Sequence, residues 1–124
     1  MMDTKMITTE ERNGVVVARV HENKLYHQAV QAFRSELLGL IDQGARPMVV
    51  DLSEVAVMNS SALGVIILAY DRLQKEGGAL ALCGLCPILE ELFLRMHLNE
   101  LFPVVKTADE GAAVLSGQKN IPAK

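Results

Sequence analysis

The chain has 124 residues, the usual size of one domain, and a formal net charge of −3 at pH 7. Half of its residues are hydrophobic and only 4% are aromatic, so we expect an aliphatic core and no basic, aromatic-rich surface for nucleic acid. The longest apolar run, 62–69, is too short to span a membrane, and the N-terminus does not resemble a signal peptide, so we expect a cytoplasmic protein.

The first half of the sequence predicts a hairpin, a helix and two short strands. Asn13-Gly14 separates two β-prone runs, and because Asn-Gly accepts the positive φ angles of a tight turn, we expect a β-hairpin there. The runs 48–50 and 55–58 are short and apolar, as is typical of buried strands. Before them, apolar residues recur at helical spacing until a stop at Gly44; they are Val30, Phe33, Leu37, Leu40 and Ile41.

A central helix and a further strand follow. The helix opens on Ser60-Ser61 and ends at Gly77-Gly78, and the run 79–82 reads as the next strand. We expect Gly64, one turn into the helix, to let the helix approach the sheet closely. The apolar stripe of this helix consists of Leu63, Ile66, Ile67, Tyr70 and Leu73.

The last part of the chain predicts two more helices and a strand. Pro87 starts a third helix at the first-turn position where proline is tolerated. A short strand lies within 101–105, and Thr107 with Glu110 forms a capping box that starts a final helix through Leu115. The apolar face of the third helix consists of Leu89, Leu92, Phe93 and Met96, and we expect Met58 and Met96 to fill the core.

This order of elements predicts one α/β domain over residues 1–117, followed by a flexible C-terminal tail over 118–124. Because helical crossovers join parallel strands, we expect a mixed sheet, in which an opening hairpin is followed by parallel strands, packed with about four helices. The chain has no coiled-coil pattern, so we expect a monomer.

Ser60 and Ser61 stand at the predicted start of the central helix, where backbone N–H groups are unpaired and the helix dipole is positive. A hydroxyl at this position can cap the helix, which is worth about 1 kcal/mol. It can also carry a phosphoryl group, whose negative charge suits the same place. The residues themselves leave both roles open.

Several short segments together match one family pattern. They are Asp51-Leu52-Ser53, Ser60-Ser61-x-Leu63-Gly64, Gly77-Gly78, Leu80-Ala81-Leu82-Cys83, Pro87 and the Leu92-Phe93 pair. With them the chain resembles the STAS family, specifically its stand-alone anti-sigma-factor antagonists, roughly from Gly14 to Leu115. The resemblance implies a STAS-like fold and a non-enzymatic binding module that sequesters an anti-sigma factor, itself a serine-protein kinase. It also implies that this kinase switches the module off by phosphorylating Ser60, with Ser61 as the alternate acceptor.

Three positions depart from the family pattern. Asn59 stands where the family usually has Asp, Ala62 where it usually has Gly, and Leu25 or Tyr26 where an Asp often closes an earlier loop. Asn keeps an acceptor oxygen but removes a charge beside the acceptor hydroxyl, so a second interpretation stays open: a constitutive STAS interaction or scaffold subunit of a transporter or sensory complex. In the first interpretation the expected partner contacts are Asn59, Ser60, Ser61 and Ala62, with Asp71 and Arg72 on the following helix.

A third candidate is a thiol redox protein built on Cys83 and Cys86, because a Cys-x-x-Cys before a helix resembles a thioredoxin-like site. The chain has no Trp and the motif comes late, so structural cysteines are favoured. Two cysteines cannot complete a tetrahedral zinc site, and we expect neither metal nor cofactor. Asp51 is typical of a loop-fixing residue. The histidines form no catalytic motif, so we expect no enzyme; they are His21, His27 and His97.

Overall fold

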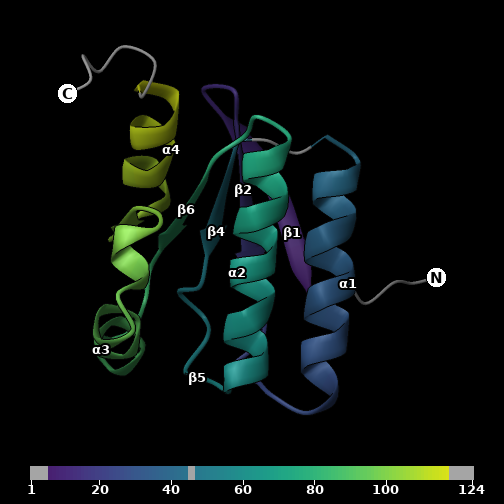
Figure 1. Ribbon diagram of the computed structural model, residues 1–124, viewed down its shortest axis with the longest axis vertical. Coiled ribbons are helices and arrows are strands. Elements are labelled where there is room, and N and C mark those ends of the chain that lie inside the picture. The colour runs from purple at the N-terminus through teal and green to yellow at the C-terminus, as the bar shows by residue number, and fades with distance from the viewer. Residues whose placement is uncertain (1–5, 45–46, 118–124) are drawn as a thin grey trace.

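The computed structural model describes residues 6–44 and 47–117, and their centre is a five-stranded mixed sheet (Figure 1). Its strands are β1 (Ile7–Arg12), β2 (Val15–Val20), β4 (Met48–Asp51), β6 (Leu80–Cys83) and β7 (Val104–Val105), which lie side by side in that order. β1 is antiparallel to β2, and all later pairings are parallel. The predicted mixed sheet is therefore confirmed.

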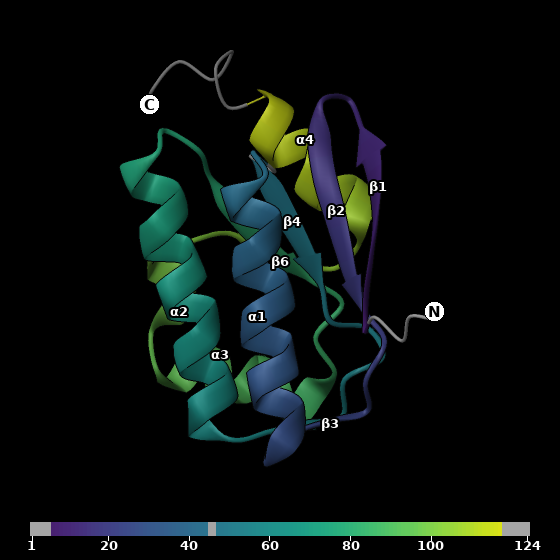
Figure 2. The ribbon, with the colours of Figure 1, turned by 90° about the vertical axis from the view of Figure 1, so that its right-hand side faces the viewer.

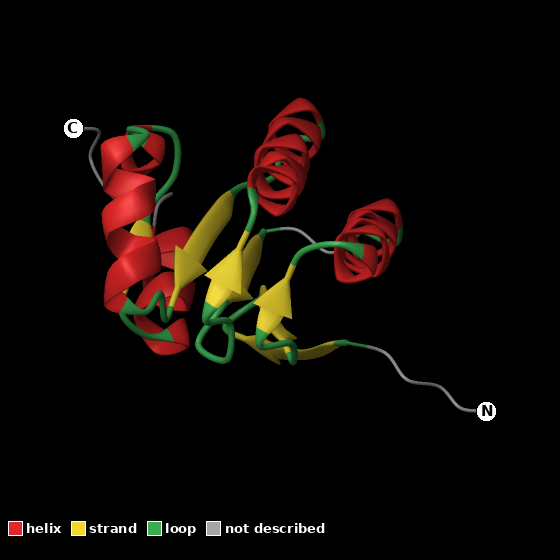
Figure 3. Cartoon of the chain, turned by 90° about the horizontal axis from the view of Figure 1, so that it is seen from below, coloured by secondary structure: helices red, strands yellow, loops and turns green. Residues whose placement is uncertain are grey.

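The described residues contain four α-helices close to where the sequence predicts them: α1 (Gln28–Asp42), α2 (Ser60–Lys75), α3 (Pro87–Arg95) and α4 (Ala108–Gly117). α1 and α2 pack side by side over one face, and α4 covers the other face (Figures 2 and 3). The core is aliphatic except for buried Phe33, Phe93 and Phe102. The predicted tail, 118–124, lies outside the described residues.

Two short parallel strands form a second, small sheet beside the start of α2. They are β3 (Lys24–Leu25) and β5 (Val57–Met58), with Leu25 opposite Met58. The sequence predicts a strand over 55–58, but only its second half is strand, because the Val55 N–H donates to Leu52 O in a turn (3.0 Å). β3 has no counterpart in the sequence prediction.

Two turns follow their sequence signals. Asn13 and Gly14 have φ angles of 56° and 79°, so the tight hairpin between β1 and β2 is confirmed. At α4, the Thr107 hydroxyl accepts the N–H of Glu110 (3.1 Å), and the Glu110 carboxylate accepts the N–H of Lys106 (2.9 Å). The predicted Thr107 cap is therefore present. The Glu110 carboxylate, however, accepts from the N–H of Lys106 and not from that of Thr107, as a capping box would require.

The expectation for Gly64 is wrong. Gly64 is exposed, and a Cβ built there meets no atom within 4 Å. The glycine that permits close packing is Gly111 of α4, where a Cβ would lie 3.0 Å from both methyl groups of Val49. Gly64 therefore leaves the outer face of α2 flat instead of bringing its inner face closer to the sheet.

Met96 is a second correction. It is 48% exposed and follows the last residue of α3, whereas Met58 is buried as predicted. The buried residues of this nine-residue helix are Leu89 and Phe93, and the helix ends at Arg95. Met96 therefore lies beyond the apolar face that the sequence predicts for it. Among the residues that the structure describes, no helix has the length and hydrophobicity that a membrane span requires.

Candidate functional site

The start of α2 presents two serine hydroxyls that do not cap the helix. Asn59 has the extended backbone of a cap residue, and its side-chain Oδ1 accepts the Ala62 N–H at 2.9 Å. Ser60 and Ser61 are both exposed, and within the described residues neither hydroxyl makes a hydrogen bond. Of the two roles that the sequence leaves open, capping therefore belongs to Asn59, and the serines remain accessible to another protein.

Backbone hydrogen bonds fix the position of this helix start. The Asn59 N–H donates to Leu25 O (3.1 Å), while the N–H groups of Ala56 and Val57 both donate to Asn23 O (2.8 and 3.2 Å). The segment before Ser60 is thus tied to the chain around β3 by main-chain atoms. Sequence reasoning missed these tethers, because backbone carbonyl groups leave no pattern in side-chain identity.

The predicted contact residues do not all reach the surface. The methyl group of Ala62 is fully buried, so the expectation that it faces a partner is wrong: a residue at the third helical position points into the core here. Asp71 is exposed and pairs with Lys75 (3.2 Å), and Arg72 pairs with Asp42 of α1 (2.9 Å).

One outward face of α2 connects the remaining predicted contacts. At about 100° per residue, Ser60, Gly64 and Asp71 share a stripe, and all three are exposed. The stripe begins at the exposed Ser60 hydroxyl and has no side chain at Gly64. About 16 Å further along the helix it ends at the side chains of the Asp71–Lys75 ion pair. A partner can therefore approach the Ser60 hydroxyl from the side of the helix without meeting a large side chain in the first turn.

The electrostatics of the α2 start favour negative charge. The first turn of α2 contains no acidic residue, and the basic residues Arg72 and Lys75 lie in its last turn. The positive end of the helix dipole is therefore not compensated by a carboxylate of the helix itself. A phosphoryl group on Ser60 would lie at this end without a like charge in the same turn.

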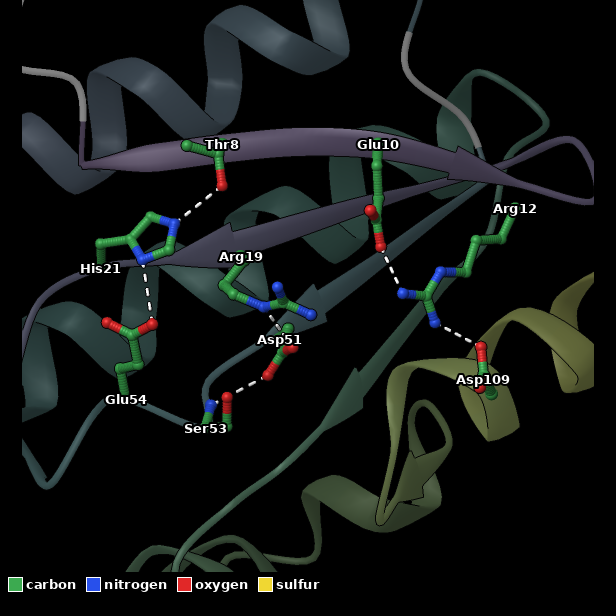
Figure 4. Close-up of polar contacts among 9 residues, drawn as sticks. All are labelled: Thr8, Glu10, Arg12, Arg19, His21, Asp51, Ser53, Glu54 and Asp109. Carbon is green, nitrogen blue, oxygen red and sulfur yellow. Dashed lines mark hydrogen bonds and ion pairs between the residues drawn. The ribbon is translucent and has the colours of Figure 1, made fainter.

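Asp51 anchors the turn that leads from β4 towards this site (Figure 4). It is 5% exposed, its carboxylate accepts Arg19 Nε–H and the Ser53 N–H, both at 2.9 Å, and its neighbour across the turn is Gly84. Burial opposes ionisation, but the Arg19 guanidinium and the hydrogen bonds from Ser53 outweigh it and hold the pKa of Asp51 below its ordinary value. The predicted loop-fixing role is confirmed.

The thiols lack the surroundings of a redox centre. Cys83 is buried at the end of β6, and burial, followed by the neighbouring Asp51 carboxylate, raises the pKa of its thiol to about 12. A thiol that stays protonated at neutral pH is a poor nucleophile. Cys86 is the cap residue before Pro87, and its Sγ lies 3.9 Å from Ala56 O.

The remaining polar candidates do not form a reactive cluster. His21 bridges Thr8 (2.7 Å) and Glu54 (3.0 Å), as Figure 4 shows, and His97 contacts Glu100 (3.2 Å). Across residues 6–44 and 47–117, no group of three or more His, Cys, Asp or Glu side chains is placed to hold a metal ion. The start of α2 is therefore the best-supported candidate site.

Comparison with known proteins agrees with this fold. The STAS domain family model matches residues 6–111, and the chain belongs to this family. The anti-sigma-B factor antagonist of Bacillus subtilis strain 168 is 27% identical over 110 residues, which cover 89% of this chain and 98% of that protein.

Two solved structures show the same fold. An anti-sigma factor antagonist from Mycobacterium paratuberculosis has a TM-score of 0.79 at 21% identity, covering 88% of this chain and 92% of that chain. SpoIIAA from Bacillus, in its phosphorylated form, has a TM-score of 0.65 at 23% identity, covering 85% of this chain and 95% of that chain. These two likenesses establish the architecture.

Proposed function

We propose that this protein is an anti-sigma-factor antagonist that binds an anti-sigma serine kinase through the start of α2 and is released when Ser60 is phosphorylated. The observation that carries the proposal is the division of roles at that helix start: Asn59 caps the helix, which leaves the Ser60 hydroxyl exposed and unbonded. In this role the protein is a cytoplasmic, monomeric, non-enzymatic binding module. The relatives named as antagonists, and SpoIIAA in its phosphorylated form, support the same role.

The switch has an electrostatic cause. A phosphoserine adds about −1.5 to −2 charges and three acceptor oxygens. Within the monomer this charge lies at the positive end of the α2 dipole, so the fold accepts it. Against a closely packed partner surface the same group brings bulk and a desolvated charge, and a hundredfold loss of affinity needs only about 2.7 kcal/mol.

The direct test is phosphorylation by candidate serine kinases of the same organism with ATP, followed by intact-mass measurement and site mapping. We expect one added phosphoryl group in the wild type and in Ser61→Ala, and none in Ser60→Ala. Circular dichroism of each variant checks that the fold is intact. Modification of Ser60→Ala at the wild-type rate would overturn the assignment of the acceptor.

Asn59 also supports the second candidate, a constitutive interaction or scaffold subunit of a transporter or sensory complex that is not phosphorylated. The neutral amide satisfies the helix cap without providing the carboxylate that the family usually places beside its acceptor. Asn59→Asp separates the two candidates, because Asp also caps a helix and restores the missing charge. Phosphorylation that appears only in Asn59→Asp would favour the scaffold role for the natural chain.

A further inference from the structure

β1 is an edge strand whose outer side is partly open. Its neighbour is β2, and the register pairs Thr9 with Ala18 and Glu11 with Val16. The His21 N–H donates to Met6 O (2.7 Å), so the alternation of an antiparallel ladder directs the N–H and C=O groups of Ile7, Thr9 and Glu11 away from the sheet. Figure 2 shows β1 at the margin of the sheet, separated from α2 by α1.

The first of these outward N–H groups already has an acceptor. The carboxylate of Glu36, on α1, accepts the N–H of Ile7 at 2.9 Å and that of Met6 at 3.1 Å. It thus stands where the carbonyl group of an added strand would stand. Further along the edge, Thr9 and Glu11 have no such side-chain acceptor among the residues that the structure describes, and their outward N–H and C=O groups remain available.

A cavity lies directly beside this open edge. It has a volume of about 210 Å³, with Ile7 and Leu40 as its apolar part and Gly39 leaving room along α1. A second cavity of about 250 Å³ continues it towards the hairpin, between Glu11 and Gln43. Because alternate side chains of an added strand point to the same side, these cavities would receive every second residue of that strand.

The charges along the edge select the kind of segment that fits. Glu11 and Glu36 place two carboxylates at the cavities beside β1. Arg12, the basic residue of this strand, already pairs with Glu10 (2.5 Å) and with Asp109 of α4 (Figure 4). The β1 strand of a second copy of this chain would offer no free cation to these carboxylates, because its Arg12 is paired in the same way.

We propose that the outer edge of β1 binds an extended, basic segment of a partner protein, which adds a sixth strand beside Thr9 and Glu11. Its backbone pairs with the free N–H and C=O groups of these two residues. Its Lys or Arg side chains point to the α1 side, where they enter the cavities and meet Glu11 and Glu36, and the residues between them point to the opposite face. This surface lies on the far side of α1 from Ser60, so the inference does not depend on the proposed phosphorylation switch.

The probe is a blocked peptide that alternates Lys and Val, compared with a Glu–Val peptide of the same length. Amide chemical shifts and hydrogen exchange of the full chain are followed during titration. We expect the Lys–Val peptide to protect the amides of Thr9 and Glu11 and to bind at least tenfold more tightly than the Glu–Val peptide. Equal binding of both peptides, or shifts that map away from β1, would overturn the proposal.

Two variants make the test specific to the edge. Thr9→Pro removes one outward N–H group, which edge strands tolerate, and should weaken the Lys–Val peptide about tenfold, whereas Thr9→Val should not. Glu11→Lys should weaken the Lys–Val peptide and strengthen the Glu–Val peptide. Thermal melts confirm folding, and Ser60→Asp should leave peptide binding unchanged. Self-association through β1 in sedimentation, lost in Thr9→Pro, would replace the basic segment by a second copy and so contradict the proposal.

Discussion

Helices α2 and α3 each follow a short apolar strand, β5 and β6 respectively, but the first turns of the two helices differ chemically. α2 is capped by the Asn59 side chain, opens on two exposed hydroxyls and has no acidic residue in its first turn. α3 has no side-chain cap, begins with Pro87 and carries Glu90 in its first turn. The same backbone feature, a positive helix end, is thus left open to an added negative charge in α2 and already faces a carboxylate in α3.

The difference shows why the α2 start suits the proposed phosphorylation better than the α3 start. Capping by the residue before the helix frees the first helical side chains from a structural role, so Ser60 can change its charge without loss of a hydrogen bond. At α3 the corresponding position is a proline, which has neither a hydroxyl nor an N–H group.

Ser60→Asp should weaken binding to the proposed kinase partner about a hundredfold, or about 2.7 kcal/mol, while the melting temperature stays the same or rises slightly. The added carboxylate is favourable at the α2 dipole but is buried against the partner. Isothermal titration calorimetry and thermal melts measure the two effects. Ser35→Asp, at an exposed position of α1, is the matched control and should bind normally. Unchanged binding by Ser60→Asp would contradict the switch.

Asp51→Asn should lower the free energy of unfolding by about 2 kcal/mol, because it removes the charge from a buried carboxylate that accepts from Arg19 and Ser53. Asp51 lies beside the turns that lead to both helices: it accepts the Ser53 N–H in the turn towards β5, and a Cβ at Gly84, in the turn before α3, would lie 3.0 Å from its Oδ1. Denaturant unfolding at neutral pH measures the loss. A change of less than about 0.5 kcal/mol would show that the pair is structurally dispensable.

The same pair predicts a pH dependence. The pKa of Asp51 is lowered in the folded protein, so its stabilisation is fully present above the ordinary Asp pKa of about 3.9 and is lost as the pH falls through the folded value. The stability difference between the wild type and Asp51→Asn should therefore be constant above about pH 5 and shrink towards zero at lower pH. If the stability difference between the two proteins stays constant below about pH 5, the ionised Asp51 carboxylate is not the source of that difference.

Asn59→Ala should cost about 1 kcal/mol, because it leaves an N–H group at the α2 start without its acceptor. Cys86→Ala, at the equivalent cap position of α3, should cost clearly less, since the Cys86 side chain caps no N–H group of its helix. Unfolding of both variants under one condition compares the two helix starts directly. Equal losses would mean that the side-chain cap is not what distinguishes α2 from α3.

The architecture was predictable because its signals are local: Asn13-Gly14 fixes a turn, Pro87 a helix start and Thr107 a cap. The position of the candidate site was predictable, since the two serines stand at the start of an apolar helix, but its details were not. Nothing in the sequence says that Ala62 faces inward or that Asn59 is the cap, because a shift of one residue around a helix changes which side chain meets the core. The hydrogen bonds that join the segment before Ser60 to the chain around β3 were not predicted, since they involve only main-chain atoms.

The smallest expected effect is a difference in the alkylation rates of the two thiols near the α3 start, Cys83 and Cys86. Alkylation by iodoacetamide at about pH 8 should modify Cys86 first, because its side chain is only half-buried, whereas Cys83 is buried and its thiol pKa is raised to about 12. Peptide mass mapping should show Cys83 labelled more than tenfold more slowly, and at the rate of Cys86 once the protein is unfolded. Fast labelling of Cys83 in the folded protein would restore the thiol redox candidate. It would also mean that the α3 start, and not only the α2 start, is chemically accessible.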